Sequence, residues 1–151
     1  MILFYQTPLL SKSNSFEKID SKNLSKYFSG IVASGNQKNS EALEFFNSSK
    51  ILINKHDPYL KRYVYTLVLE NKVSQAINYV RQNQDKDNAK FFDAYLLLLI
   101  DSLKKNDLDT AFNVISKASK FVEEDRFNLA ILESFKPVSY THLTLPTTPY
   151  V

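Results

Sequence analysis

Acidic side chains with a spacing suited to metal binding occur in one stretch of the chain, DKDNAKFFDAYL. Asp85 and Asp87 stand in the alternation with which a calcium-binding loop begins. The later positions do not fit, because the position that needs glycine is Lys90 and the position that needs a bidentate glutamate is Leu96. The sequence therefore predicts neither a metal site nor a bound cofactor.

Groups for acid, base or nucleophilic catalysis are equally sparse. His56 lies in the polar turn NKHDP, and a lone histidine supplies neither the ligand set of a zinc site nor the partners of a catalytic triad. The second histidine, His142, falls in a C-terminal stretch of different character. Gly30 and Gly35 are too few for a phosphate-binding loop, and the absence of cysteine excludes thiol chemistry. We predict no catalytic residue and a protein that is not an enzyme.

The amino-acid composition and charge argue against some classes of binding partner. Hydrophobic residues at 44% and charged residues at 23% are typical of a soluble globular protein. The formal net charge of +3 comes from lysines scattered along the chain, which favours a solvated surface over a nucleic-acid interface. Phe45, Phe46, Phe91 and Phe92 have helical spacing, which favours core packing over base stacking. No run approaches the roughly 18 apolar residues of a membrane span. We expect no nucleic-acid partner and no membrane span.

The N-terminal stretch, residues 1–20, has two interpretations. Met1 to Tyr5 is an apolar run, and Ser11 to Ser13 is a triplet of the kind found at signal-peptide cleavage sites. No basic segment precedes the run, and Gln6 and Pro8 interrupt it. The stretch is either the remnant of a signal peptide, which implies a periplasmic protein, or an N-terminal arm of a cytoplasmic one.

The C-terminal stretch, residues 137–151, differs in composition from the rest of the chain. It has no lysine, arginine, aspartate or glutamate, and its alternation of Thr with Leu and Pro has neither a helix nor a strand period. The part from Val138 to Thr147 resembles the translation of a transposon-based sequencing adapter. We therefore interpret residues 137–151 as a non-native tail and expect the natural domain to be truncated near Lys136.

An internal repeat organises the remaining residues. The stretches NQKNSEALEFF, ENKVSQAINYV and KNDLDTAFNVI each carry an alanine four positions before a large apolar residue. Ala42, Ala76 and Ala111 are 34 and 35 residues apart. Two antiparallel helices of about a dozen residues and two tight turns fill this period, and alanine suits the point where the two helices approach most closely.

Apolar segments and helix-capping residues also occur at positions that agree with this period. An apolar helix precedes each alanine-bearing one: LSKYFSGIVA, YLKRYVYTLVL and DAYLLLLIDSL. Ser21 is expected to cap the first of these helices, Asp57 followed by Pro58 the second, and Asp87 or Asn88 the third. A fourth such helix, RFNLAILESFK, is expected to start near Asp125.

Over residues 21–136 the chain resembles the tetratricopeptide-repeat (TPR) family in a degenerate form of bacterial type. Gly30 matches the position where that family often has glycine, whereas Val64 and Leu99 occupy the equivalent positions in the later repeats. The resemblance implies an all-α fold, an α-solenoid of about three helix pairs plus a truncated further helix.

The resemblance also implies a function. A TPR-like solenoid is a non-catalytic scaffold that binds a protein or peptide partner in its concave groove, which the first helix of each pair lines. Alternatively, the repeats are a structural accessory region of a longer enzyme or envelope assembly protein. The family's groove positions correspond here to seven residues: Tyr27, Ile31, Lys61, Tyr65, Leu96, Ile100 and Lys104.

Overall fold

The described part of the chain is entirely helical. The computed structural model describes residues 20–120, 122 and 125–144, with side chains as far as Lys136. It contains no strand within these residues, so the predicted all-α class is confirmed. The helices are α1 (Ser21–Gly35), α2 (Asn39–Asn47), α3 (Pro58–Leu69), α4 (Val73–Asn83), α5 (Phe92–Lys104), α6 (Leu108–Ser119) and α7 (Arg126–Thr144), with the short 3-10 turns η1 (Lys50–Asn54) and η2 (Asp87–Ala89).

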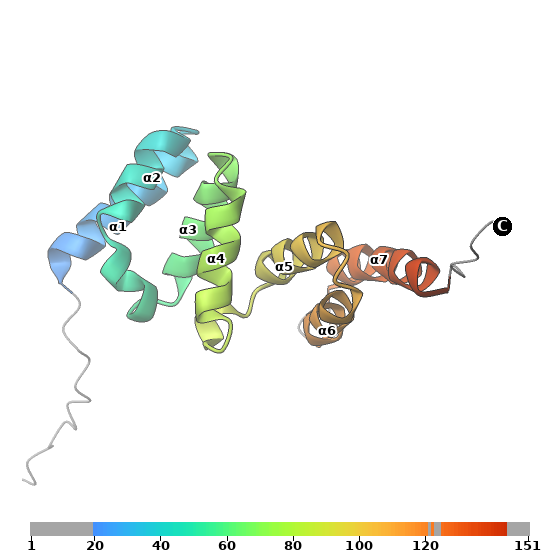
Figure 1. Ribbon diagram of the computed structural model, residues 1–151. Helices are drawn as coiled ribbons and strands as arrows, with labels where there is room; N and C mark the ends of the chain where they lie inside the picture. Colours follow the sequence, from blue (N-terminus) through green and yellow to red (C-terminus); the bar gives the residue numbers. More distant parts are fainter. Residues whose placement is uncertain (1–19, 121, 123–124, 145–151) are drawn as a thin grey trace, which may run out of the picture.

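Neighbouring helices pack in pairs. The most extensive contacts join α1 with α2, α5 with α6, and α3 with α4, and α7 packs on α6. The second helix of each pair also contacts the first helix of the next, so the pairs follow one another in an array with α1 at one end and α7 at the other (Figure 1). This is a repeat-like arrangement, as the spacing of the alanines predicted.

The turn inside each pair has the same construction three times. One residue of each turn adopts a left-handed conformation, with φ of 61° at Gln37, 57° at Asn71 and 57° at Asn106. The amide of the next residue donates to the carbonyl five residues earlier, in the last turn of the first helix, at 2.8–3.0 Å. This pattern is the Schellman helix ending, and it reverses the chain so that the two helices of a pair lie against each other.

The predicted alanines occupy the contact inside each pair. Ala42, Ala76 and Ala111 are all completely buried. In the first pair the approach is closest at Gly30, where a β-carbon would lie 2.8 Å from the ring of Phe46. The equivalent residues in the later pairs, Val64 and Leu99, are also buried, and the residues that correspond to Phe46 in register are the smaller Val80 and Ile115.

The helices begin close to the predicted positions, but the capping hydrogen bonds differ from the predicted ones. The carboxylate of Asp20, and not the predicted Ser21, caps α1 by accepting from the Lys22 amide at 3.0 Å. Pro58 is the first residue of α3 as expected, but the Asp57 side chain makes no capping hydrogen bond because its backbone is already helical. Asp87 and Asn88 lie in η2, and α5 begins later, at Phe92.

Two hydrophobic clusters make up the core, and they meet along α5. The first spans Tyr27 to Ala94 and the second spans Leu99 to Leu132. Phe46 is fully buried, and the other three phenylalanines of the predicted set pack against these clusters, which confirms their role as core residues.

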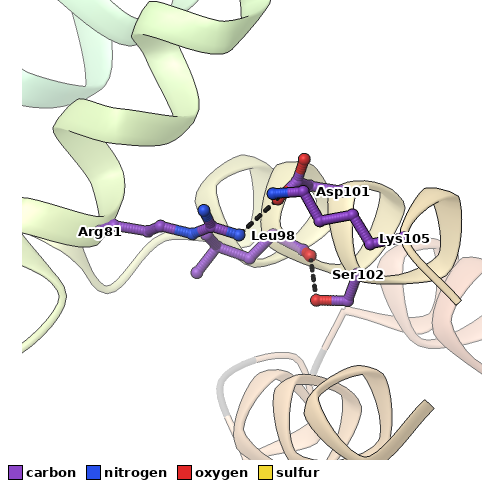
Figure 2. A network of polar contacts seen from close by, with 5 residues as sticks. All are labelled: Arg81, Leu98, Asp101, Ser102 and Lys105. Carbon is purple, nitrogen blue, oxygen red and sulfur yellow. Dashed lines mark hydrogen bonds and ion pairs between the residues drawn. The ribbon is translucent and has the colours of Figure 1, made fainter. Parts of the chain in front are cut away.

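An ionic network joins α4 to α5 where the two clusters meet. Arg81 of α4 reaches across to Asp101 of α5, and Lys105 of α5 donates to the same carboxylate oxygen at 2.8 Å (Figure 2). The Asp101 side chain is only 12% exposed. Ser102 donates to the Leu98 carbonyl one turn back, so the hydroxyl of this buried serine is hydrogen-bonded. The network therefore links the second helix pair to the third.

The last helix, α7, begins near the predicted position and extends beyond the predicted end of the domain. The fourth helix was predicted from near Asp125, and α7 begins at Arg126 with Asp125 accepting from the amides of Phe127 and Asn128. The backbone of residues 137–144 continues α7, although the sequence there has no helix period. Residues 1–19 and 145–151 lie outside the described residues. Of the helices that are described, none combines the length and apolarity needed to cross a membrane.

Candidate binding groove between α3 and α5

A groove of about 690 Å³ lies between the first helices of the second and third pairs. Both walls are helical, α3 on one side and α5 on the other, and Phe91 closes the end nearest the start of α5. The lining side chains are mainly apolar: Pro58, Lys61, Arg62, Val64, Tyr65, Val68, Phe91, Asp93, Leu96, Leu97 and Ile100.

The groove exists because the two junctions between pairs differ. At the first junction α1 packs directly on α3, and the aromatic rings of Tyr27 and Tyr59 lie 5.5 Å apart across it. At the second junction α3 contacts η2 and approaches α5 more sparsely. A face of each helix that is covered at the first junction is therefore open at the second.

The apolar part of the groove presents large side chains to solvent. Tyr65 is 56% exposed and Ile100 is 48% exposed, and they come from opposite walls. Val64 is buried beneath them. Exposed large apolar groups that share one concavity are a common mark of a binding surface, whereas single ones are unremarkable.

The charged part of the groove lies near the N-terminus of α3. Lys61 is 3.8 Å from the Asp93 carboxylate and 5.9 Å from the centre of the Phe91 ring. Both partners of this ion pair are about 60% exposed, so water screens the pair and it holds Lys61 weakly. Arg62 adds a second cation, so the lining carries two positive groups and one negative group.

Four of the seven predicted groove residues line this concavity together. They are Lys61, Tyr65, Leu96 and Ile100. Lys104 lies at the end of α5 and lines a separate hollow of about 350 Å³ with Arg81 and Asp101.

The two residues predicted from the first pair do not line the groove. Tyr27 is 2% exposed, and its ring packs edge-on against His56 at 4.7 Å and against Phe46 at 5.9 Å. Ile31 is half-buried against the same cluster. Tyr27 and Ile31 therefore lie apart from the groove, since both pack against the first hydrophobic cluster.

Sequence reasoning missed several groove residues. Arg62, Val68 and Leu97 all line it, together with Phe91 and Asp93. Arg62 and Leu97 occupy the same repeat position, one residue after Lys61 and Leu96, so the repeat register contained a signal for them. Phe91 precedes α5 and has no such signal, because its place depends on the path of the chain through η2.

A second polar cluster joins η1 to α3 and α4. The Lys50 ammonium lies 5.5 Å from the ring centre of Tyr63 and 5.4 Å from that of Tyr79. A hydrogen bond with Lys50 lowers the pKa of Tyr79, whereas burial raises the pKa of Tyr63 to about 12. Tyr63 also donates to the Asn47 side chain at 2.8 Å. The cluster therefore links η1 and the end of α2 to α3 and α4.

Comparison with known proteins adds no assignment. No protein-family model matches the chain, and no curated protein matches it either.

Within the described residues, no three histidine, aspartate or glutamate side chains gather as a metal site would require. Asp87, from the calcium-like stretch, pairs instead with Lys90 at 2.6 Å.

Proposed function

We propose that this protein is a non-catalytic interaction module of TPR-like type, which binds a peptide segment of a partner protein in the groove between α3 and α5. The observation that carries the proposal is the groove itself. Exposed apolar side chains from two helices share one concavity with a pair of cations at one end. Its volume of about 690 Å³ falls in the range of roughly 300–1,000 Å³ that is usual for ligand-binding pockets.

The lining specifies the chemistry of the peptide. Apolar side chains of the peptide would pack between Tyr65 and Ile100, removing these exposed groups from water. A carboxylate of the peptide would lie by Lys61 and Arg62, where it would compete with the exposed Asp93 for Lys61. The preferred ligand is therefore a helical or extended peptide with apolar anchors and an acidic residue at one end.

Selection from a peptide display library against the whole chain tests this function. Selected peptides should share apolar anchors flanked by an acidic residue, and their affinity can be measured by fluorescence anisotropy. Tyr65→Ala should weaken binding by about tenfold or more, since truncation of a buried aromatic anchor typically costs upward of 1 kcal/mol. Lys61→Glu should weaken acidic peptides selectively.

Ile51→Ala is the matched control. Ile51 is 57% exposed, as Tyr65 is, but it lies in η1 and does not line the groove. Binding should be unchanged in this variant. If folded Tyr65→Ala and Lys61→Glu variants bind the selected peptides as tightly as the unsubstituted chain, the groove is not the site. If no peptide is selected, the role as a structural accessory region of a longer protein becomes the better account.

A further inference from the structure

The hollow of about 350 Å³ between α4 and the end of α5 shares no lining residue with the groove. We call it the basic hollow, because three of its four charged side chains are cations. Its polar lining consists of Ser74, Asn78 and Arg81 from α4, and Asp101, Lys104 and Lys105 from the end of α5. The three residues from α4 are spaced by four and three positions, so they share one face of that helix.

Asp101 holds two of the cations together. A single oxygen of its carboxylate contacts both Arg81 from α4 and Lys105 from the end of α5 (Figure 2). Because both cations contact the same oxygen, they lie close enough together for one small anion to contact both. The Asp101 side chain is only 12% exposed, whereas those of Arg81 and Lys105 are 42% and 55% exposed. Most N–H groups of the two cations therefore remain available, since arginine carries five and lysine three.

The other polar groups of the basic hollow are hydrogen-bond donors without a partner. Within the part of the chain that the structure describes, the side chains of Ser74, Asn78 and Lys104 make no hydrogen bond or ion pair. Three positive charges and one negative charge line the hollow, which gives it a net charge of +2. Asp107 lies nearby, but it caps α6 and does not line the hollow. The basic hollow thus combines excess positive charge with unused donors.

The equivalent junction between α2 and α3 shows which group is absent here. Ser40 and Glu70 correspond in register to Ser74 and Lys105. The Ser40 hydroxyl donates to the Glu70 carboxylate at 2.8 Å, so a serine of the second helix meets an acceptor at the end of the next first helix. At the junction between α4 and α5 a lysine takes the place of that acceptor. A bound anion would supply the acceptor that the chain itself provides at the first junction.

Charge and donor number match a phosphate monoester better than a carboxylate. A phosphate monoester carries a charge of about −1.5 to −2 at pH 7 and offers three strong acceptor oxygens. A carboxylate carries one charge and two oxygens, and would leave the net charge of the hollow only half neutralised. Ile77 also lines the hollow and would contact the carbon chain that bears the phosphate.

We propose that the basic hollow binds a phosphate monoester, with Arg81, Lys104 and Lys105 around its oxygens and the Ser74 hydroxyl donating to one of them. Two sources share this chemistry: a phosphorylated serine of a protein, and a free small phosphate compound. The site lies apart from the peptide groove, so either proposal can fail without the other.

A nuclear magnetic resonance titration of the full chain tests the site. The probe is O-phosphoserine with its amino and carboxyl groups blocked, and blocked aspartate is the matched carboxylate. At an ionic strength of about 10 mM, where screening is weak, the phosphate probe should cause saturable shifts of the amide signals of Ser74, Asn78 and Lys105. Blocked aspartate should bind at least about threefold more weakly, because it carries less charge. Equal affinity for the two ligands, or no saturable shift with the phosphate probe, would overturn the proposal.

Variants at exposed positions distinguish a site from general attraction to a positively charged protein. Lys104→Gln removes one cation of the hollow and should raise the dissociation constant of the phosphate probe about threefold or more. Asn78→Glu places a carboxylate where the first junction has Glu44, and it should abolish detectable binding. Lys22→Gln is the matched control, because Lys22 is an exposed lysine of α1 outside the hollow. If Lys22→Gln weakens binding as much as Lys104→Gln does, or if Asn78→Glu still binds the probe, the proposal is wrong.

Two further ligands identify the source of the phosphate. Inorganic phosphate and a short peptide with one central phosphoserine are titrated under the same conditions, and circular dichroism checks that every variant used remains helical. Tighter binding of the peptide than of inorganic phosphate identifies a phosphorylated protein as the source. Binding of inorganic phosphate at least as tight as that of the peptide identifies a free phosphate compound. A peptide that binds equally well with unmodified serine in place of phosphoserine would refute the phosphate site.

Discussion

Gly30 is the residue at which a single added methyl group is expected to change the stability of the fold most clearly. In Gly30→Ala the new β-carbon would lie 2.8 Å from Cε1 of Phe46, 3.0 Å from Cδ1 and 3.1 Å from Cζ. Phe46 is completely buried, and its ring sits between those of Tyr27 and Tyr59, each 5.9 Å away. The ring has no open side to move into, so α1 and α2 must separate.

Two opposing free-energy contributions decide how much Gly30→Ala changes the free energy of unfolding. Overpacking a buried contact typically costs about 1–3 kcal/mol. Alanine in place of glycine within a helix gains about 1 kcal/mol from propensity. The expected net loss in the free energy of unfolding is therefore about 0–2 kcal/mol. Gly35 supplies the control, because it ends the same helix and nothing lies within 4 Å of its added β-carbon. Gly35→Ala should be neutral or stabilising by up to about 1 kcal/mol.

Urea unfolding followed by far-UV circular dichroism measures both variants, and a double-mutant cycle isolates the cause. Phe46→Leu shortens the side chain that the new methyl group meets, so Gly30→Ala should cost less in that background than alone. In the later pairs the residues equivalent to Gly30 and Phe46 are Val64 with Val80 and Leu99 with Ile115, so a larger residue at the first position goes with a smaller one at the second. If Gly30→Ala stabilises the protein as much as Gly35→Ala does, the close approach of α1 and α2 is wrong.

Three further outcomes are expected. Gln37→Gly should raise the thermal midpoint, corresponding to about 0.5–1 kcal/mol, because Gln37 holds φ of 61° at a position where glycine carries no steric cost. Ala76→Leu should lower the free energy of unfolding in urea by about 1–3 kcal/mol, since Ala76 on α4 is completely buried. Asp101→Asn should lower the thermal midpoint at neutral pH. Hydrogen bonding to Lys105 and the charge of Arg81 depress the pKa of Asp101, so its stabilisation is complete above the usual carboxyl pKa of about 4 and is lost as pH falls through the lower folded value. The difference between the two proteins should accordingly shrink in thermal scans at acidic pH.

The sequence by itself determined the helix pairs. Their period is set by helix length and turn length, which are local properties, and the alanines mark the contact that every pair must make. The left-handed residues Gln37, Asn71 and Asn106 repeat at the same spacing, so one turn geometry recurs three times. Local chemistry misled at helix starts, such as Asp87, where the path between two pairs decides which residue begins the helix, and at residues 137–144, which continue α7 without a helix period.

Only the tertiary structure decided which repeat positions are open to a partner. Tyr27, Lys61 and Leu96 are equivalent in register, yet the first is buried and the other two line the groove. The same difference occurs at another repeat position, where Ile31 packs against the core while Tyr65 and Ile100 line the groove. The spacing along the chain determines which side of its own helix a residue occupies. Whether that side is covered depends on the contacts that its helix makes with the next pair, and these contacts involve residues from different repeats.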